Sequence, residues 1–364
     1  MRSKKLCTTI SQMKSTTIGL YSDTHVKVFK KNSRFYDDHI APAFQKFYRE
    51  CAERKAKIKI HLGDFYHLKD VVSTEVLDKT FSMEYEASEN FEQSIYLVGN
   101  HDSYMKRDHS IHLLKTFRPF AKVVDKDYEY IDIDNGQTRL HLCPYTSEDD
   151  VVRIVKSVNM GTGKNLFFGH FGLNGFIMQA DGYTDQYTSI NKHLFSKFDF
   201  AFFGHFHFHQ RQGNCAYVSS PFQARHGDEE GEHGFVFFDT DKPDKFDFVE
   251  NEFSPKFVTL DLTKKNVEKM LKLEKHFIRI NKKSDVDPSV LEKLKYTLQK
   301  KNYHVKFVAA EATSALTDDF QIASIQEWQD LVYKDPEEVI EEFVKMNEKK
   351  FKHTPEEIMA EMKL

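Results

Sequence analysis

The stretch FAFFGHFHFHQ, residues 200–210, joins a wholly apolar run to three histidines in alternating positions. In an extended strand alternate side chains share a face, so His205, His207 and His209 would all point in one direction. Two interpretations are open: a histidine-bearing strand face, or the last part of a metal site. If Gly204 ends the strand, the alternation no longer governs the histidines, and the rest of the chain decides between the two.

Four more apolar runs precede this one and are typical of buried parallel strands: TTIGLYS, IKIHL, SIYLVG and NLFFG. The segments FYDDHIAPAFQKFYRECAER and STEVLDKTFSMEYEASE lie between the first three and are amphipathic, which predicts helices. This β-α alternation predicts an α/β fold with a mostly parallel sheet covered on both faces. Strands alone follow (NCAYVSS, HGFVFFDT, KFDFVEN and KFVTLDL), and they predict a second sheet packed against the first.

The composition is that of an ordinary soluble globular protein, with 364 residues, 40% hydrophobic and 30% charged. No apolar run approaches the roughly 18 residues of a membrane helix. The N-terminus lacks the apolar core of a signal peptide, and the start could be Met1 or Met13. Four scattered cysteines indicate free thiols in a reducing compartment, so we expect a cytoplasmic location without membrane association. The net charge of −4 does not favour nucleic-acid binding, although bound metal ions, a basic loop or a partner could supply the attraction.

The pattern changes after Leu262. KHFIRINKK, DPSVLEKLKYTLQKK and NYHVKFVAA predict a small β-α-β unit, and EATSALTDD is a polar linker. SIQE, DPEE and TPEE then mark the starts of three short helices. Their apolar stripes either pack on the preceding domain or bind a partner. We therefore expect domains at 14–261 and 262–312, and a helical segment at 313–364.

Five polar clusters each follow one of five apolar strands. The loops at the carboxyl ends of strands in an α/β sheet converge on one crevice, so the clusters are expected to meet there. Each cluster alone is common, but five in one structural context are hard to attribute to chance. They are SDTH (Asp23, His25), LGDFYH (Asp64, His67), GNHD (Asn100, His101, Asp102), GH (His170) and GHFH (His205, His207).

These side chains offer carboxylate, imidazole and carboxamide ligands without a thiolate, a set that suits Mn, Fe or Zn. They are too many for one ion and enough for two, with Asp64 as the natural bridge. Two ions about 3.5–4 Å apart are the usual device for in-line displacement at phosphorus. His101 is the candidate general acid for the leaving oxygen, and its neighbour Asp102 is the candidate group that orients it.

The order D-x-H, G-D, G-N-H-D, G-H, G-H-x-H, over about residues 17–238, resembles the calcineurin-like metallophosphoesterase superfamily. The resemblance implies a two-sheet metallophosphoesterase sandwich flanked by helices, with His101 as the catalytic histidine. It also implies two divalent ions, with Mn expected and Fe or Zn as alternatives. One ion would be bound by Asp23, His25, Asp64 and His207, and the other by Asp64, Asn100, His170 and His205.

Within that superfamily, GDFYH, GHFHFHQ and YVSSPFQ followed by an acidic stretch resemble the SbcD-type nucleases of DNA double-strand-break repair. GHFGLNGF and SIQEWQDLV resemble the T-even phage members. This likeness implies that the β-α-β unit is a capping domain and that the C-terminal helices dock on an SbcC-type coiled-coil ATPase. It also implies a nuclease homodimer within a heterotetramer, in the cytoplasm of a bacterial or phage-infected cell. One departure is that Ser219 or Ser220 stands where the family has a glycine.

The leading hypothesis is a Mn-dependent DNA nuclease, acting as an exonuclease on duplex ends and an endonuclease on single strands. The alternatives are a small-substrate metallophosphoesterase, acting on phosphoproteins, cyclic nucleotides or pyrophosphates, and a scaffold without catalysis. The basic loop after SDTH would suit phosphate-backbone contacts, although it could equally be a solvated charge run. The candidate substrate-binding residues are Lys30, Lys31, Arg34, His67 and His209.

Overall fold

The computed structural model describes residues 15–27, 36–69, 71–105, 108–126, 128–178, 182–229, 231–252, 256–282 and 288–309. Several features expected from the sequence lie outside these residues. They are the two candidate start positions, the basic residues Lys30, Lys31 and Arg34, and the helical segment 313–364.

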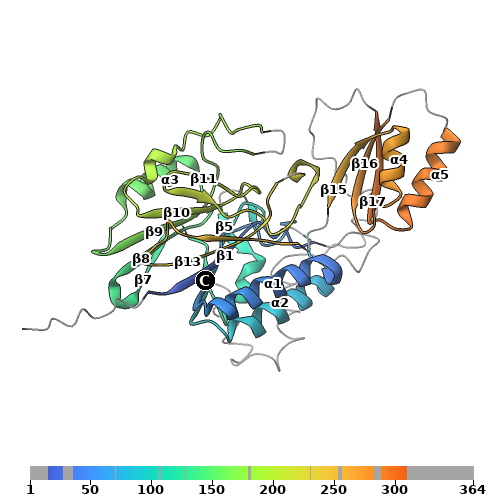
Figure 1. Ribbon diagram of the computed structural model, residues 1–364. Helices are drawn as coiled ribbons and strands as arrows, with labels where there is room; N and C mark the ends of the chain where they lie inside the picture. The colour runs from blue at the N-terminus through green and yellow to red at the C-terminus, as the bar shows by residue number, and fades with distance from the viewer. Residues whose placement is uncertain are drawn as a thin grey trace, which may run out of the picture.

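Two sheets of six strands each form the main body of the described chain (Figure 1). In the first sheet the strand order is β14-β13-β1-β2-β3-β6. The four strands β1, β2, β3 and β6 run parallel, and β13 pairs antiparallel with β1. The bounds are β1 (Thr17–Tyr21), β2 (Ile58–His61), β3 (Gln93–Leu97), β6 (Lys122–Val124), β13 (Gly234–Asp239) and β14 (Asp247–Glu250).

The second sheet has the order β11-β12-β10-β9-β8-β7. The strands β8, β9, β10 and β12 are parallel, with β7 and β11 antiparallel at the edges. The bounds are β7 (Glu129–Ile133), β8 (Thr138–Cys143), β9 (Lys164–His170), β10 (Phe200–Gly204), β11 (Gln210–Gln212) and β12 (Cys215–Tyr217).

The core lies in three layers, because alternate residues of each strand face opposite sides. Phe200 and Phe202 of β10 join the core between the two sheets, whereas Ala201 and Phe203 face the outer layer. Helices α1 (Ala41–Arg54) and α2 (Thr74–Ser88) lie side by side against the outer face of the first sheet (Figure 1). Helix α3 (Glu148–Ser157) packs on the outer face of the second. The predicted α/β sandwich flanked by helices is thus confirmed.

The division of strands between the sheets differs from the expectation. NLFFG and FAFFG form β9 and β10 of the second sheet, while HGFVFFDT and KFDFVEN contribute β13 and β14 of the first. A strand buried on both faces has the same apolar pattern in either sheet, so the pattern alone could not assign it.

Short elements complete the body: the hairpin β4 (Ser103–Met105) and β5 (Asp108–His112), the π-helix η1 (Tyr36–Ile40), and the 3-10 helices η2 (Leu113–Phe117), η3 (Asp134–Gly136), η4 (Lys192–Phe195) and η5 (His226–Asp228).

A smaller unit follows, with three parallel strands in the order β15-β16-β17 and two helices (Figure 1). Its own apolar core contains Met270, Ile278, Ile280, Leu298 and Val305. KFVTLDL, expected in the second sheet, instead supplies β15, which pairs with β16. The domain division at 261 itself stays a prediction. The bounds are β15 (Phe257–Asp261), α4 (Lys264–Met270), β16 (Phe277–Lys282), α5 (Pro288–Gln299) and β17 (His304–Ala309). In the part of the chain described, no helix is both long and apolar enough to cross a membrane.

Candidate metal centre

The five polar clusters meet at the carboxyl ends of β1, β2, β3, β9 and β10, as expected for an α/β sheet. Three groups of side chains offer ligand atoms within 4.8 Å of one another: Asp23 with His25 and His207, Asp64 with His170 and His205, and His25 with His67 and His101. The first group joins the ends of β1 and β10, and the second joins the ends of β2, β9 and β10. Both sheets therefore contribute to one site.

The backbone at these strand ends is strained in a way that is typical of functional sites. Asp23, His25, Asp64 and His205 have φ values of 51°, 40°, 55° and 96°, in the left-handed region that side chains rarely adopt. Each such residue costs on the order of 1–3 kcal/mol. β10 ends at Gly204, so the strand alternation stops before His205, as the sequence analysis expected.

The first group brings two imidazoles together edge to edge. His25 Nε2 lies 3.1 Å from His207 Nε2, and His207 Nε2 lies 4.0 Å from Asp23 Oδ1. Two ring nitrogens this close need a proton or a cation between them. The separation suits two ligands of one ion, because metal–nitrogen bonds of about 2.0–2.1 Å at roughly a right angle span about 3 Å. Burial holds the pKa of His25 well below its ordinary value, which keeps its ring neutral and able to bind a metal.

The second group is arranged around Asn100. Its Oδ1 lies 3.0 Å from His170 Nε2 and 3.0 Å from His205 Nδ1, and Asp64 Oδ1 lies 3.3 Å from His170 Nε2. The other oxygen of Asp64, Oδ2, lies 3.8 Å from His25 Nε2. Asp64 thus faces both groups with different oxygens, as a bridging carboxylate would.

The donor set fits a pair of divalent cations. Asp23 and Asp64 are both almost completely buried. Burial, together with the charge of Asp64, raises the pKa of Asp23, and a nearby cation would remove that cost. Burial also lowers the pKa of His205 to about 3, so that its imidazole is neutral. Burial lowers the pKa of His170 and His207, but Asp64 raises the pKa of His170 to about 9 and Asp228 raises that of His207, so protons on these two rings supply positive charge that bound cations would replace.

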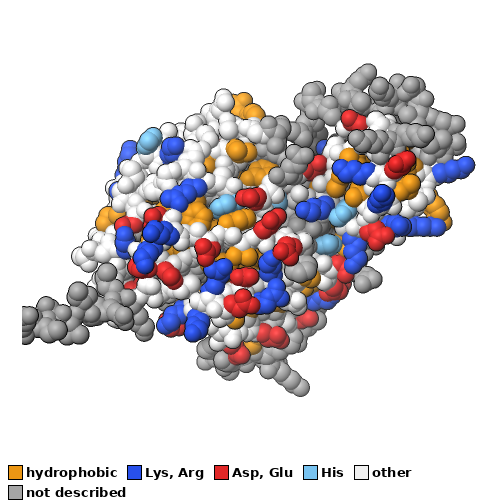
Figure 2. Space-filling view, viewed as in Figure 1, with side chains coloured by type: hydrophobic (Ala, Val, Ile, Leu, Met, Phe, Trp, Pro, Cys, Tyr) orange, Lys and Arg blue, Asp and Glu red, His pale blue; other side chains and the backbone are white. Residues whose placement is uncertain are grey.

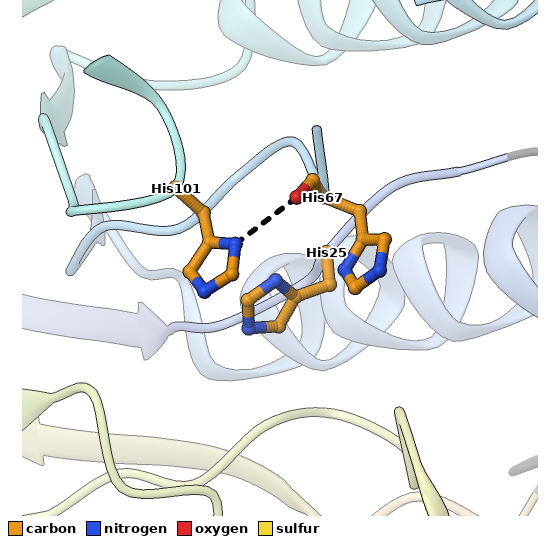
Figure 3. A group of neighbouring side chains, drawn as sticks. All are labelled: His25, His67 and His101. Atoms are coloured by element: carbon orange, nitrogen blue, oxygen red, sulfur yellow. Dashed lines mark hydrogen bonds between the residues drawn. The ribbon is translucent and has the colours of Figure 1, made fainter. Parts of the chain in front are cut away.

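His101 lies beside both groups, and its backbone N–H donates to Asp64 Oδ1 at 2.7 Å. Its Nδ1 is 3.0 Å from the carbonyl oxygen of His67 (Figure 3). A carbonyl only accepts, so Nδ1 carries the proton and donates it, which leaves Nε2 as the atom that can exchange a proton with substrate.

Asp102 has a different position from the one predicted. Its two carboxylate oxygens accept from the backbone N–H groups of Tyr66, at 3.0 Å, and of Gly99, at 2.8 Å. The carbonyl of His67, not Asp102, therefore holds the His101 ring, and Asp102 holds the loops that carry it. The adjacency of the two residues could not reveal this, because their partners lie about 35 positions away in the chain, at Tyr66 and His67.

His67 forms a third imidazole beside His25 and His101 (Figure 3). Its ring is parallel to that of His101, with centroids 5.9 Å apart, and His25 is nearly perpendicular to both. Burial lowers the pKa of His67 to about 2, so this ring is neutral as well. Its predicted contact with substrate stays a prediction.

His209 lies in a packing environment. Its Nδ1 is 3.0 Å from the carbonyl oxygen of Tyr217, and its ring stacks on Phe248 with centroids 4.1 Å apart. The alternation in FHFHQ does not bring it to His205 and His207, since none of the three ligand groups among the described residues includes it.

Asp228 is a residue of this site that the sequence motifs do not predict. This carboxylate is fully buried, and its Oδ2 lies 2.9 Å from His207 Nδ1, which leaves Nε2 of His207 for the first group. His170 is held in the same way by the carbonyl oxygen of Leu62, 2.6 Å from its Nδ1. Such partners fix the orientation and tautomer of metal-binding histidines. Asp228 stands in the acidic stretch HGDEEGEHG, and no spacing in the sequence connects it with His207.

A metal-dependent phosphoesterase is the class of protein that this fold and this site define. The chain belongs to the calcineurin-like phosphoesterase family, whose model matches residues 16–209, more than half of the sequence. It is 25% identical to exonuclease subunit 1 of Enterobacteria phage T4 over 254 residues, which are 65% of this chain and 67% of that protein.

Solved structures with a similar chain path include two phosphatases. Purple acid phosphatase PPD1 from yellow lupin (Lupinus luteus) seeds has 12% identity and a TM-score of 0.43, over 63% of this chain and 50% of that one. A dimetal phosphatase from Danio rerio has 13% identity and a TM-score of 0.38, over 61% of this chain and 91% of that one. The chain thus spans half the length of the lupin phosphatase.

Proposed function

We propose that this protein is a Mn-dependent DNA nuclease, an exonuclease on duplex ends and an endonuclease on single strands. The observation that carries the proposal is the position of Asp64, whose Oδ1 lies 3.3 Å from His170 Nε2 and whose Oδ2 lies 3.8 Å from His25 Nε2, with His101 bonded to Oδ1 through its backbone N–H. The similarity to a phage exonuclease subunit supports DNA as the substrate.

Two divalent ions, when bound, supply neutralisation of the phosphoryl oxygens and a hydroxide nucleophile. Asp23, His25, Asp64 and His207 would hold one ion, and Asp64, Asn100, His170 and His205 the other. Nitrogen and oxygen donors suit Mn, with Fe or Zn as alternatives.

The chain's own contribution to the chemistry is to hold one proton at a defined atom. The His67 carbonyl keeps the His101 ring in place through Nδ1. A proton on Nε2 of His101 then passes to the oxygen that leaves phosphorus, so that the product departs as an alcohol rather than an alkoxide. His67, which lies beside His101, would contact the bound phosphate.

Binding of DNA needs a source of positive charge, because the protein carries a net charge of −4. Figure 2 shows basic and acidic side chains mixed over the face in view, without a continuous basic stripe among the described residues. We assign the attraction to the bound ions, to Lys30, Lys31 and Arg34, and to a partner. That partner is an SbcC-type coiled-coil ATPase, which segment 313–364 would contact in a heterotetramer with two nuclease subunits. The complex would act in DNA end processing, recombination and repair.

The test is cleavage of linear duplex DNA by the purified full chain with Mn²⁺. Asp64→Asn should abolish cleavage, and His101→Gln should slow it by roughly 10²–10⁴-fold, the range for loss of a general acid. Asp132→Asn and His193→Gln are matched controls, because both side chains are exposed. Hydrolysis of bis-p-nitrophenyl phosphate without any DNA cleavage, even with the ATPase added, would overturn the nuclease proposal in favour of a small-substrate phosphoesterase.

A further inference from the structure

The turn that supports His207 also contacts the β15–β17 unit. We call residues 223–229, which include η5, the η5 turn. Within it, Asp228 is fully buried and its Oδ2 accepts from the backbone N–H of Ala224 at 2.8 Å as well as facing His207 Nδ1 at 2.9 Å. The carboxylate is thereby fixed to the turn and to the histidine at once.

The next residue, Glu229, faces the other way and binds the middle of β15. Its Oε2 accepts from the backbone N–H of Thr259 at 3.0 Å, and its Oε1 accepts from the Thr259 hydroxyl at 2.6 Å. His226 Nδ1, in the same turn, lies 2.8 Å from Glu229 Oε1. Three bonds therefore join one carboxylate to the strand and to its own turn.

The start of the η5 turn is held by the same strand. Gln223 Oε1 accepts from the backbone N–H of Phe257 at 2.6 Å, and His226 packs edge-on against the Phe257 ring. Phe257 in turn stacks on Phe277 of β16 with centroids 4.5 Å apart. The turn is thus bound to β15 at both of its ends, while its buried carboxylate reaches the metal centre.

The β15–β17 unit has a second attachment, at a different place on the main body. The Tyr303 hydroxyl donates to Asp38 Oδ2 at 3.0 Å and lies 2.7 Å from His39 Nε2, both in η1. This attachment provides a natural control, because it holds the same unit without passing through the η5 turn.

We propose that the η5 turn transmits the position of the β15–β17 unit to His207, and so sets the metal affinity of the group formed by Asp23, His25 and His207. The inference rests on the proposed function only in assuming that this group binds a metal ion. A shift of β15 moves Glu229, and Asp228 must follow because it is the adjacent residue. The His207 ring then turns relative to Asp23 and His25. His170 is held instead by the backbone carbonyl of Leu62, directly after β2 of the first sheet.

The experiment is a Mn²⁺ titration of the full chain without DNA, followed by calorimetry and by the electron paramagnetic resonance of bound Mn²⁺. Thr259→Val removes the hydroxyl bond to Glu229 and the longer contact with His226 at 3.4 Å, but it keeps the shape and the backbone N–H. Glu229→Gln weakens the whole contact. Each should lower the affinity of one of two bound ions by about fivefold, the size that a lost hydrogen bond gives. Asp228→Asn is the reference and should lower the affinity of the same ion by roughly 10–100-fold. Tyr303→Phe should leave both affinities unchanged.

Wild-type affinities in both Thr259→Val and Glu229→Gln would overturn the proposal. Equal weakening by Tyr303→Phe would also overturn it, because the effect would then be a general loosening of the unit. Circular dichroism identifies any variant that fails to fold. If Glu229→Gln fails to fold, the Mn²⁺ affinity of Thr259→Val alone tests the proposal. If these affinities change as expected but the wild type does not cut DNA, the nuclease proposal fails and the proposal about the η5 turn stands. A wild type that binds no Mn²⁺ would overturn both.

Discussion

His170 and His207 each present Nε2 to one of the two ligand groups, and each is held through Nδ1 by a different kind of partner. His170 is held by the backbone carbonyl of Leu62, at the end of the central strand β2. His207 is held by the side chain of Asp228, in a turn that also contacts the β15–β17 unit. The first partner is a backbone group at the end of a strand, whereas the second is a side chain on a turn.

Glycines tighten the surroundings of His170 further. Gly63 has a φ of +103°, and a Cβ added there would overlap Nδ1 of His170. A Cβ on Gly204 would overlap Ser22 Oγ and the Leu62 carbonyl. The backbone therefore packs directly against the His170 ring, and only glycine allows this approach. One ligand group is thus built into the sheet itself, whereas the other depends on a side chain in a turn.

The largest effect is expected from Gly63→Ala. The new methyl group would displace His170 and adopt a backbone conformation that L-residues avoid, so unfolding should require about 2–5 kcal/mol less free energy. One of the two Mn²⁺ ions should be lost as well. Denaturant unfolding and the stoichiometry of bound metal measure the two effects.

The matched control is Gly213→Ala. Gly213 also has a positive φ, of +66°, but a Cβ there meets no atom within 4 Å. This variant should lose only about 1–2 kcal/mol, the cost of the left-handed conformation, and should keep both ions. If Gly63→Ala lost no more stability than Gly213→Ala and kept both ions, the close packing of the backbone against His170 would not matter for metal binding.

The rates at which the two metal ions are released should also differ between the two ligand groups, although this effect is smaller. When a chelator is mixed with the Mn²⁺-loaded protein, the ion bound with His207 should leave about 10-fold faster than the ion bound with His170, because its ligand rests on a side chain. Stopped-flow measurement should show two phases, and Asp228→Asn should accelerate the faster one alone. A single phase, or acceleration of both phases by Asp228→Asn, would show that the two ligand groups hold their ions alike.

The sequence predicted well which strand-end side chains come together, because each cluster depends on a few consecutive residues at the end of an apolar strand, whereas their binding of metal stays a prediction. It predicted poorly what depends on contacts between distant residues. Asp228 is 21 positions from His207, and Leu62 is 108 positions from His170, so no local spacing connects them. The assignment of strands to sheets failed for a related reason, since strands such as β9 and β10 are buried on both faces and look alike in either sheet.

The wrong assignment of KFVTLDL, which forms β15, has the same cause. KFVTLDL alternates apolar and polar residues as any half-buried strand does. Its pairing with β16 is decided by the packing of Phe257 on Phe277. The strand therefore belongs to the small unit, and this arrangement gives the η5 turn its second partner.

The smallest effect is expected from His209→Gln, which replaces the last of the three alternating histidines. The ring of His209 stacks on Phe248 and bonds to the Tyr217 carbonyl, so its loss should lower the free energy of unfolding by about 1 kcal/mol. Binding of Mn²⁺ should be unchanged and DNA cleavage should stay within about twofold, whereas His207→Gln should lose an ion. Thermal unfolding, metal stoichiometry and cleavage rate would be measured on both variants. A loss of cleavage of about 10-fold in His209→Gln with unchanged stability would place this ring against the substrate, and the three histidines would then share one face in function although they do not share one in the fold.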